Sequence, residues 1–275
     1  MIKKIIAILS VVLILGSVLF GIGYFLSNND SDSVEQSPKT ELELDEFNSI
    51  EIKVKAADIK IQEGDTFSIS YKLHDRERVK QAEVLDGTLY FITEFDMNWK
   101  VDFDDWNICI TLPKGRTLED LSLSTIDGDI EFDGRTIDIA NLKSTSGNIK
   151  LTNIIAEQVN CEVTSGEISI TESQVTEATG IGTATDIYFD GSFESANINT
   201  VSGSCKLNSD TIKNISIESV SGDIETITPS TGISAKSYGK ITYNGEKQGF
   251  EFSLSDNESA LNLISASGKI QIQTK

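Results

Sequence analysis

Residues 93–106 combine carboxylates with aromatic rings more densely than any other segment of the chain. Asp96, Trp99, Asp104 and Trp106 are its candidate contact residues, because aromatic faces beside polar groups are typical of surfaces that bind carbohydrates or other ligands. The alternative is a solvated hairpin whose rings cover the first layer of strands and whose charges protect an open sheet edge. The sequence leaves both interpretations open.

The chain has few residues of the types that catalytic sites use. Asp127 and Asp129 flank Gly128, and paired carboxylates at a controlled separation can hydrolyse glycosidic bonds. However, the single histidine, His74, and three cysteines without metal-type spacing disfavour a zinc site, a Cys/His nucleophile and a Ser/His/Asp triad. We therefore predict no enzyme, no cofactor and no metal, and we expect His74 to lie in a solvent-facing turn.

Four carboxylates recur at nearly regular spacing and suggest a binding column. Asp129, Glu167, Asp186 and Asp223 each follow a glycine or its equivalent in the repeat described below. If they face solvent on strands stacked about 4.8 Å apart, a divalent ion or a cationic peptide would relieve their repulsion, with weak, salt-sensitive affinity. The alternative is that the negative charge only keeps the protein soluble.

The overall charge excludes one large class of partners. The 275 residues include 43 Asp and Glu against 23 Lys and Arg, for a formal net charge of -20. A nucleic acid would meet the wrong sign of charge, so we predict no nucleic-acid binding. With 39% hydrophobic residues, 20 Gly and only 3 Pro, the composition indicates a β-rich globular body rather than disorder.

The amino terminus reads as a membrane anchor. Residues 5–26 form an uncharged apolar stretch after Lys3 and Lys4, long enough as a helix to cross a bilayer. The positive-inside rule then places residues 1–4 in the cytoplasm and the carboxyl-terminal body outside it. A cleaved signal peptide is the alternative, because Gly21 and Gly23 leave processing open. The polar residues 27–41 are predicted to be a flexible linker.

An internal repeat dominates the rest of the chain. From residue 42 to residue 118, short runs of alternating apolar and polar residues predict β-strands that form an amino-terminal β cap region. From residue 119 to residue 275, similar pieces recur, most of them 17 to 19 residues apart, with a last step of 29 residues. The clearest copies read TIDGDI (125–130), STSGNI (144–149), VTSGEI (163–168), VSGDI (220–224) and ASGKI (266–270).

The positions of the repeat carry a consistent physical pattern. Two residues after each glycine, or after Thr185 where it replaces glycine, the chain places Ile130, Ile149, Ile168, Ile187, Cys205, Ile224, Ile241 and Ile270. A short strand cannot bury such an apolar face alone, but parallel stacking of successive turns, or rungs, buries it continuously. The sequence therefore predicts an all-β parallel β-solenoid with rungs of about 19 residues. Each glycine forms a sharp corner, and Cys161 and Cys205 act as small buried side chains.

The repeated corner, together with the Leu112-Pro113-Lys114-Gly115 turn and the amino-terminal anchor, resembles the bacterial putative-adhesin family of unknown function built from β-strand repeats. LiaG-like proteins of Gram-positive cell-envelope stress operons are of that type. The resemblance covers about residues 42–275 and implies an extracytoplasmic β-solenoid linked to envelope homeostasis. It brings no catalytic residues.

Three functions from different classes remain open at this stage. The first is a membrane-anchored binding or sensing module in the cell envelope, with envelope proteins or cationic peptides as partners. The second is a structural spacer or assembly element. The third, least favoured, is a polysaccharide-active enzyme, which would need a pair of carboxylates in a cleft.

Overall fold

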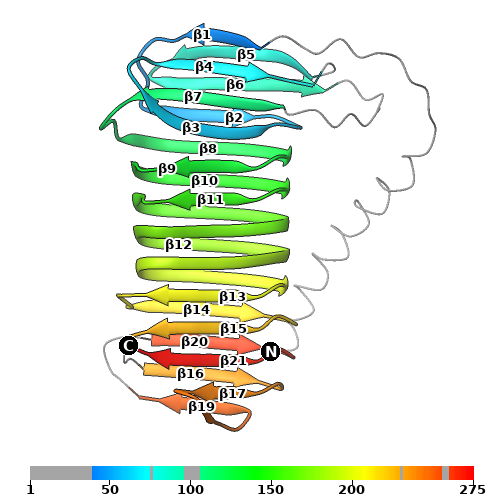
Figure 1. Ribbon diagram of the computed structural model, residues 1–275, viewed down its shortest axis with the longest axis vertical. Coiled ribbons are helices and arrows are strands. Elements are labelled where there is room, and N and C mark those ends of the chain that lie inside the picture. The colour runs from blue at the N-terminus through cyan, green and yellow to red at the C-terminus, as the bar shows by residue number, and fades with distance from the viewer. Residues whose placement is uncertain (1–38, 75–76, 96–105, 230–231, 256–259) are drawn as a thin grey trace, which may run out of the picture.

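The computed structural model describes residues 39–74, 77–95, 106–229, 232–255 and 260–275 (Figure 1). All regular secondary structure in these ranges is β-strand. The strands are β1 (Thr40–Glu43), β2 (Ser49–Lys53), β3 (Asp58–Gly64), β4 (Ser68–Lys72), β5 (Glu77–Leu85), β6 (Thr88–Phe95), β7 (Asn107–Pro113), β8 (Leu118–Asp127), β9 (Ile130–Asp133), β10 (Thr136–Ser146), β11 (Ile149–Thr152), β12 (Ile155–Ser202), β13 (Cys205–Ser209), β14 (Asn214–Ser219), β15 (Ile224–Thr228), β16 (Gly232–Ser237), β17 (Ile241–Tyr243), β18 (Glu246–Lys247), β19 (Glu251–Leu254), β20 (Ala260–Ser265) and β21 (Ile270–Thr274).

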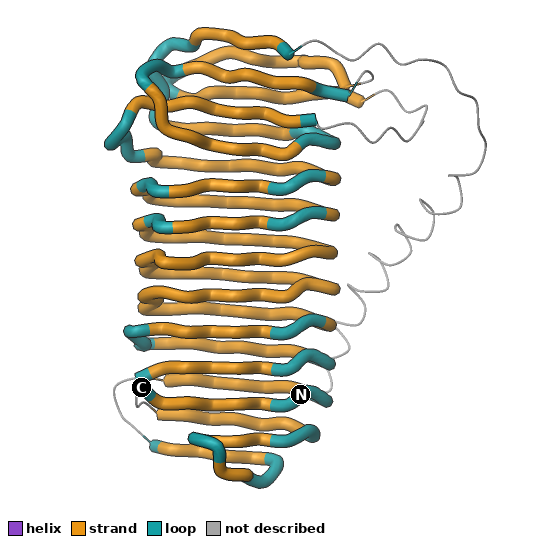
Figure 2. Tube along the Cα trace, in the orientation of Figure 1, coloured by secondary structure: helices purple, strands orange, loops and turns teal. Residues whose placement is uncertain are grey.

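The strands stack as rungs along one long axis, as Figures 1 and 2 show. Each rung is a first strand, a corner and a second strand, as in β8 and β9 or β10 and β11. First strands pair in parallel with first strands, and second strands with second strands. Leu142 of β10 pairs with Leu123 on one side and Cys161 on the other. The all-β, solenoid-like fold and its 19-residue register are therefore confirmed.

The core lies between the layer of first strands and the layer of second strands. The predicted apolar column after each corner is buried throughout, with at most 1% of any side chain exposed: Ile130, Ile149, Ile168, Ile187, Cys205, Ile224, Ile241 and Ile270. In the second-strand layer Ile149 pairs with Ile130 and with Ile168. Each side chain therefore packs against its equivalent in the neighbouring rung, which is how a short strand becomes stable here.

The corner glycines stack directly on one another. A Cβ atom added to Gly147 would lie 2.1 Å from the carbonyl oxygen of Gly128, and one added to Gly166 would lie 2.3 Å from the carbonyl oxygen of Gly147. Gly147 also has a φ of 153°, in a region that other residues rarely adopt. The corner therefore requires glycine for two independent reasons, backbone conformation and close approach of the next rung.

We expect Gly147→Ala to lower the free energy of unfolding by about 2–4 kcal/mol, because the new methyl group must push two rungs apart while φ stays strained. Gly249→Ala is the matched control, since the carbonyl oxygen of Glu251, its nearest neighbour, would lie 3.9 Å from the added Cβ. The control should stay within about 0.5 kcal/mol. Denaturant midpoints of the two variants measure the difference, and equal midpoints would contradict the stacked corner.

The carboxyl-terminal rungs do not stack in chain order. After β14 and β15 the chain passes to β16 and β17, but these strands do not pair with β14 and β15. Instead β20 pairs with β14 on one side and β16 on the other, and β21 lies likewise between β15 and β17. The last rung of the sequence is thus inserted one place inside the end of the stack. The extra residues of the long last repeat form β18 and β19, which pair antiparallel with β17 and β16 and cap the stack. A simple sequential order of rungs is wrong here.

The amino-terminal end mirrors this arrangement. The first rung of the chain, β2 and β3, lies between β8 and β9 on one side and β6 and β7 on the other. Antiparallel pairing of β4 with β7, β5 with β6 and β1 with β4 closes this end. The stack of rungs therefore continues into the amino-terminal β region, beyond the predicted start of the solenoid at residue 119.

The predicted membrane anchor, residues 5–26, and most of the linker, residues 27–41, lie outside the described residues. Within the described ranges no helix is long and apolar enough to span a membrane. The described part of the chain begins at residue 39, directly before β1, at the amino-terminal end of the stack (Figure 1).

Candidate functional site

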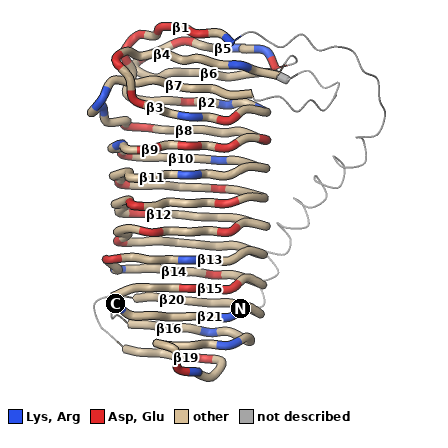
Figure 3. The backbone as a smooth tube through the Cα atoms, viewed as in Figure 1, with Lys and Arg blue, Asp and Glu red and all other residues tan. Residues whose placement is uncertain are grey.

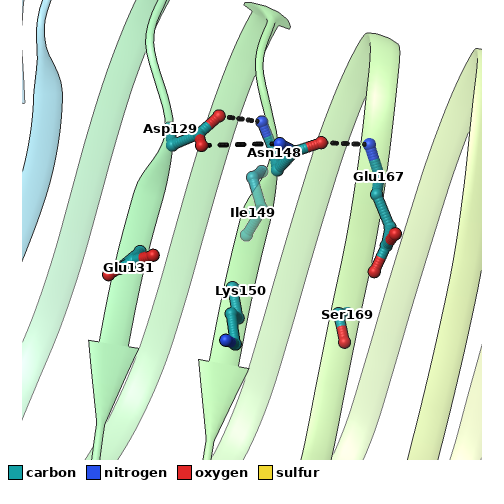
Figure 4. Close-up of a pocket in the computed structure, with 7 residues that line it drawn as sticks. All are labelled: Asp129, Glu131, Asn148, Ile149, Lys150, Glu167 and Ser169. Atoms are coloured by element: carbon teal, nitrogen blue, oxygen red, sulfur yellow. Dashed lines mark hydrogen bonds between the residues drawn. The ribbon is translucent and has the colours of Figure 1, made fainter.

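The residues that follow the corner glycines, together with Asp58 after Ala57 in the first rung, form a hydrogen-bonded ladder. Asp58 accepts a hydrogen bond from the backbone N–H of Asp129 (2.8 Å), and Asp129 accepts one from the N–H of Asn148 (2.6 Å). Asn148 in turn accepts one from the N–H of Glu167 (2.9 Å). Figure 4 shows the last two of these contacts. Each side chain thus satisfies a corner N–H of the next rung, a group that would otherwise lack a partner.

The same contact recurs further along the stack. Asp186 accepts a hydrogen bond from the N–H of Ser204 (2.7 Å), and Asp223 accepts one from the N–H of Lys269 (2.7 Å). The second of these bonds reaches the inserted carboxyl-terminal rung. The structure therefore places all four predicted column residues along one corner, but it gives three of them, Asp129, Asp186 and Asp223, a structural contact.

Uncharged residues interrupt the predicted acidic column. Asn148 lies between Asp129 and Glu167. This order follows from the register two residues further along, where Lys150 pairs with Glu131 on one side and with Ser169 on the other. Of the four carboxylates, only those of Glu167 and Asp186 belong to successive rungs of the repeat without an intervening uncharged residue. Among the described residues, no group of three or more His, Cys, Asp or Glu side chains is arranged to hold a metal ion.

We expect Asp129→Ala to cost about 1 kcal/mol of unfolding free energy, because it removes an acceptor from the N–H of Asn148. Glu167→Ala is the matched control from the same corner. Glu167 is exposed, and truncation of its side chain should change the unfolding free energy by less than about 0.5 kcal/mol. Urea unfolding of both variants measures the difference. A larger loss of stability in the Glu167 variant would show that the structural role of Asp129 is misassigned.

Two shallow depressions lie beside this corner, on the second-strand layer. The first has a volume of about 190 Å³ and is lined by Asp129, Glu131, Asn148, Ile149, Lys150, Glu167 and Ser169, all labelled in Figure 4. The second, of about 290 Å³, shares Glu131 and Lys150 with it. Lys60 pairs with Glu131 at 3.3 Å. Both depressions are open and carry charged side chains, and Figure 3 shows further acidic and basic positions along the stack. They can hold a polar chain on the surface rather than enclose a small molecule.

A buried column of hydroxyl groups was missed in the sequence. Three residues before a corner glycine, Ser144 donates to the carbonyl oxygen of Gly128 (3.0 Å) and Ser265 donates to that of Gly222 (3.1 Å). Ser265 also accepts from the N–H of Gly268 (2.8 Å). The signal was present, since Ser or Thr recurs at this position of the repeat. These hydroxyls satisfy corner backbone groups from inside the core, which makes them structural residues.

The aromatic segment is described only at its ends. Asp96, Trp99 and Asp104 lie outside the described residues. Trp106 is partly buried and packs edge-on against His74, with ring centroids 4.4 Å apart. His74 is only 8% exposed, so the prediction of a solvent-facing turn residue is wrong: the imidazole covers an aromatic ring at the cap instead.

A buried carboxylate beside this segment was also missed. Glu77 is 6% exposed and accepts a hydrogen bond from the N–H of Lys55 (2.7 Å) and another from the hydroxyl of Thr93. Lys55 belongs to the corner between β2 and β3. Glu77 therefore fastens the cap to the first rung of the chain, and a charge in this position is stabilised by its donors.

The three cysteines are free thiols within the described structure. Cys161 and Cys205 are buried, which confirms their predicted role as small core residues. Burial raises the pKa of Cys161 to about 12, and burial with the charge of Asp186 raises the pKa of Cys205 to about 12. Both thiols therefore keep their protons far above neutral pH and are poor nucleophiles.

These pKa values predict a loss of stability at alkaline pH. In an unfolded chain a thiol ionises near its ordinary pKa of about 8.5, so the stabilisation from a protonated buried thiol is complete below that pH and is lost as the pH rises toward 12. The slope approaches about 1.4 kcal/mol per pH unit for each thiol. Cys161→Val should flatten the fall between pH 9 and pH 11. Denaturant unfolding with reductant present tests this, and parallel pH curves for the two proteins would contradict it.

Two solved structures are similar to this chain over most of its length. A solved structure named as a putative adhesin from Bacteroides fragilis NCTC 9343 is 16% identical to this chain. Its alignment covers 86% of this chain and 96% of that one, with a TM-score of 0.52. A structure named as a putative lipid binding protein, from Parabacteroides distasonis ATCC 8503, is 13% identical over the same shares of the two chains, with a TM-score of 0.46.

At these identities the first structure shows a shared fold and nothing more, and a search of curated proteins finds no match. The family model described as Toastrack DUF4097 matches residues 47–274. That range contains every complete rung of the stack together with the cap strands from β2 onward. The chain therefore belongs to the Toastrack DUF4097 family.

Proposed function

We propose that this protein is a non-enzymatic binding module, anchored in the cytoplasmic membrane by residues 5–26 and exposed on the extracytoplasmic side. The uncharged span after Lys3 and Lys4 supports the anchor and its orientation. The adhesin name of the Bacteroides fragilis neighbour supports a binding role. The resemblance to LiaG-like proteins supports a role in the response to cell-envelope stress.

The observation that carries the proposal is the long, charged corner of the stack with its two open depressions. Asp129, Asp186 and Asp223 are engaged with backbone N–H groups, so they hold the corner in shape. Glu131 and Glu167 line the first depression with exposed carboxylates. A regular row of rungs presents these groups to an extended partner, and the acidic character favours a basic peptide or a basic segment of an envelope protein.

Binding of a cationic peptide tests the proposal directly. Calorimetry at low salt should detect weak binding of an oligolysine peptide to the full chain in detergent, with an affinity that falls as salt is added. Glu131→Gln combined with Glu167→Gln should weaken binding several-fold without lowering stability. The matched control is Glu157→Gln combined with Glu162→Gln. Both carboxylates are exposed and lie in the part of β12 that pairs with β10, in the layer of first strands, so their loss should leave binding unchanged. Equal binding of the peptide by both double variants would show that the first depression is not the binding site.

A structural spacer is the second candidate, because the inserted rung near each end of the stack is paired on both of its sides. The two functions differ in what they require of the surface. A spacer needs the length of the stack and tolerates the loss of Glu131 and Glu167, whereas a binding module does not. Recovery of envelope partners with the full chain, and their loss with the Glu131/Glu167 variant, would separate them.

A further inference from the structure

The carboxyl-terminal end of the stack exposes large apolar side chains. Tyr238 is 76% exposed, Phe250 is 65% exposed and Leu254 is 38% exposed. Phe250 directly precedes β19, which begins at Glu251, and Leu254 ends it. Phe252, between them, stacks on Tyr243 with ring centroids 4.9 Å apart. Antiparallel pairing sets Phe252 beside Ala235 and Leu254 beside Ile233, two buried residues of β16. Phe250 and Leu254 therefore leave apolar surface exposed along this strand, at the edge of the core.

β19 is also an open sheet edge among the described strands, since it pairs only with β16. The N–H of Ser237 donates to the carbonyl oxygen of Phe250 (2.9 Å), so the main-chain groups of Phe250 point toward β16. Because these groups alternate along an antiparallel strand, those of Phe252 and Leu254 point the same way. The N–H and C=O groups of Glu251 and Ser253 then point outward, away from the stack.

We propose that β19 pairs antiparallel with β19 of a second copy of this chain across a two-fold axis. The register that uses the outward main-chain groups of both residues sets Glu251 of one copy opposite Ser253 of the other, so the axis passes beside Phe252. The same register places Phe250 opposite Leu254 and Phe252 opposite Phe252. Phe250, Phe252 and Leu254 thus each gain an apolar neighbour, and the exposed apolar surfaces of the two ends are buried against each other.

Charge favours a second copy over other occupants of this edge. Residues 232–275 carry five lysines and four carboxylates, whereas the whole chain has 23 Lys and Arg against 43 Asp and Glu. Two copies repel each other over most of their surface and least at this end. In the proposed register Glu251 faces a serine, so no like charges meet across the axis. A balanced, self-complementary patch is what an isologous contact requires. The inference is separate from the proposed binding of cationic peptides.

Site-directed cross-linking of the full chain in detergent tests the register. Opposed residues of a non-hydrogen-bonded pair lie about 4.5 Å apart at Cα, a distance that a disulfide can bridge. Phe250→Cys combined with Leu254→Cys should therefore form a covalent dimer under mild oxidation. Within one molecule the two positions are roughly 13 Å apart along the strand, so they cannot close on each other. Phe250→Cys with Ser253→Cys is the out-of-register control and should yield at least tenfold less dimer. The wild-type chain measures the background of covalent dimer that forms through the partly exposed Cys109.

A second pair of variants tests the edge without cysteine chemistry. Ser253→Pro removes an outward N–H and should make the full chain monomeric by sedimentation, while the pairing with β16 is kept. Ser253→Ala keeps the N–H and should leave the dimer intact. Absence of covalent dimer in the matched cysteine pair, or equal yields from the matched and control pairs, would overturn the proposal. So would a wild-type monomer whose carboxyl-terminal end binds anionic vesicles or a strand of another protein.

Discussion

Deletion of residues 260–275 is expected to unfold residues 232–254 as well, rather than only to shorten the stack. In a solenoid built in chain order the last rung can be removed with little effect on the others. Here β20 and β21 lie between β14/β15 and β16/β17, so their loss leaves β16 and β17 without neighbours on that side. The deletion also removes the buried Leu261, Leu263, Ile270 and Ile272, each of which contributes about 1.5–3 kcal/mol.

Hydrogen exchange read peptide by peptide measures this effect. Peptides within residues 232–254 should lose their protection in the deletion variant, and those within β8 to β11 should keep theirs. Gln271→Ala with Gln273→Ala is the control, because both side chains point out of the same rung and are exposed. Retained protection of residues 232–254 would mean that β16 stacks directly on β14, and that the inserted rung is not needed for the end of the fold.

Ile168→Asp is expected to lower the free energy of unfolding by about 4 kcal/mol or more. Ile168 is fully buried and packs against its equivalent, Ile149, in the adjoining rung. A carboxylate there would be a buried charge without a donor and would leave a gap beside Ile149. Glu167→Lys, one residue earlier, changes a side chain that faces solvent and should stay within about 0.5 kcal/mol. Denaturant unfolding of the two variants gives the comparison, and similar losses would show that the alternation of buried and exposed positions is misassigned.

The 19-residue period, the apolar columns and the glycine corners could be predicted from the sequence because each of them is a local property repeated many times. Ile149 must pack against Ile130 and Ile168 once the period is known, since parallel rungs place equivalent residues beside each other. The corner at Gly147 follows from the same repetition. Cys161 and Cys205 could be placed in the core for the same reason.

The roles of single polar residues depended on contacts between rungs. Asp129 has the sequence features of an exposed carboxylate, and only the stacked structure places an N–H of Asn148 2.6 Å from it. His74 and Glu77 belong to a polar run, yet they are buried at the cap by Trp106 and by the corner at Lys55. Burial of a polar side chain is decided by its donors and neighbours, which lie far away in the chain.

The order of the end rungs was decided only by the tertiary structure. Every rung presents the same columns at the same register, so β16 fits β14 as well as it fits β20 as far as the sequence pattern can tell: Ser237 and Ser219 both pair with Ser265. The sequence determined that the rungs stack and which face each side chain takes, because alternation and period are local. It could not determine which rung neighbours which at the two ends, because the rungs have the same pattern and any of them could pair with any other. The choice depends on how the cap strands and the connections are arranged at each end of the stack.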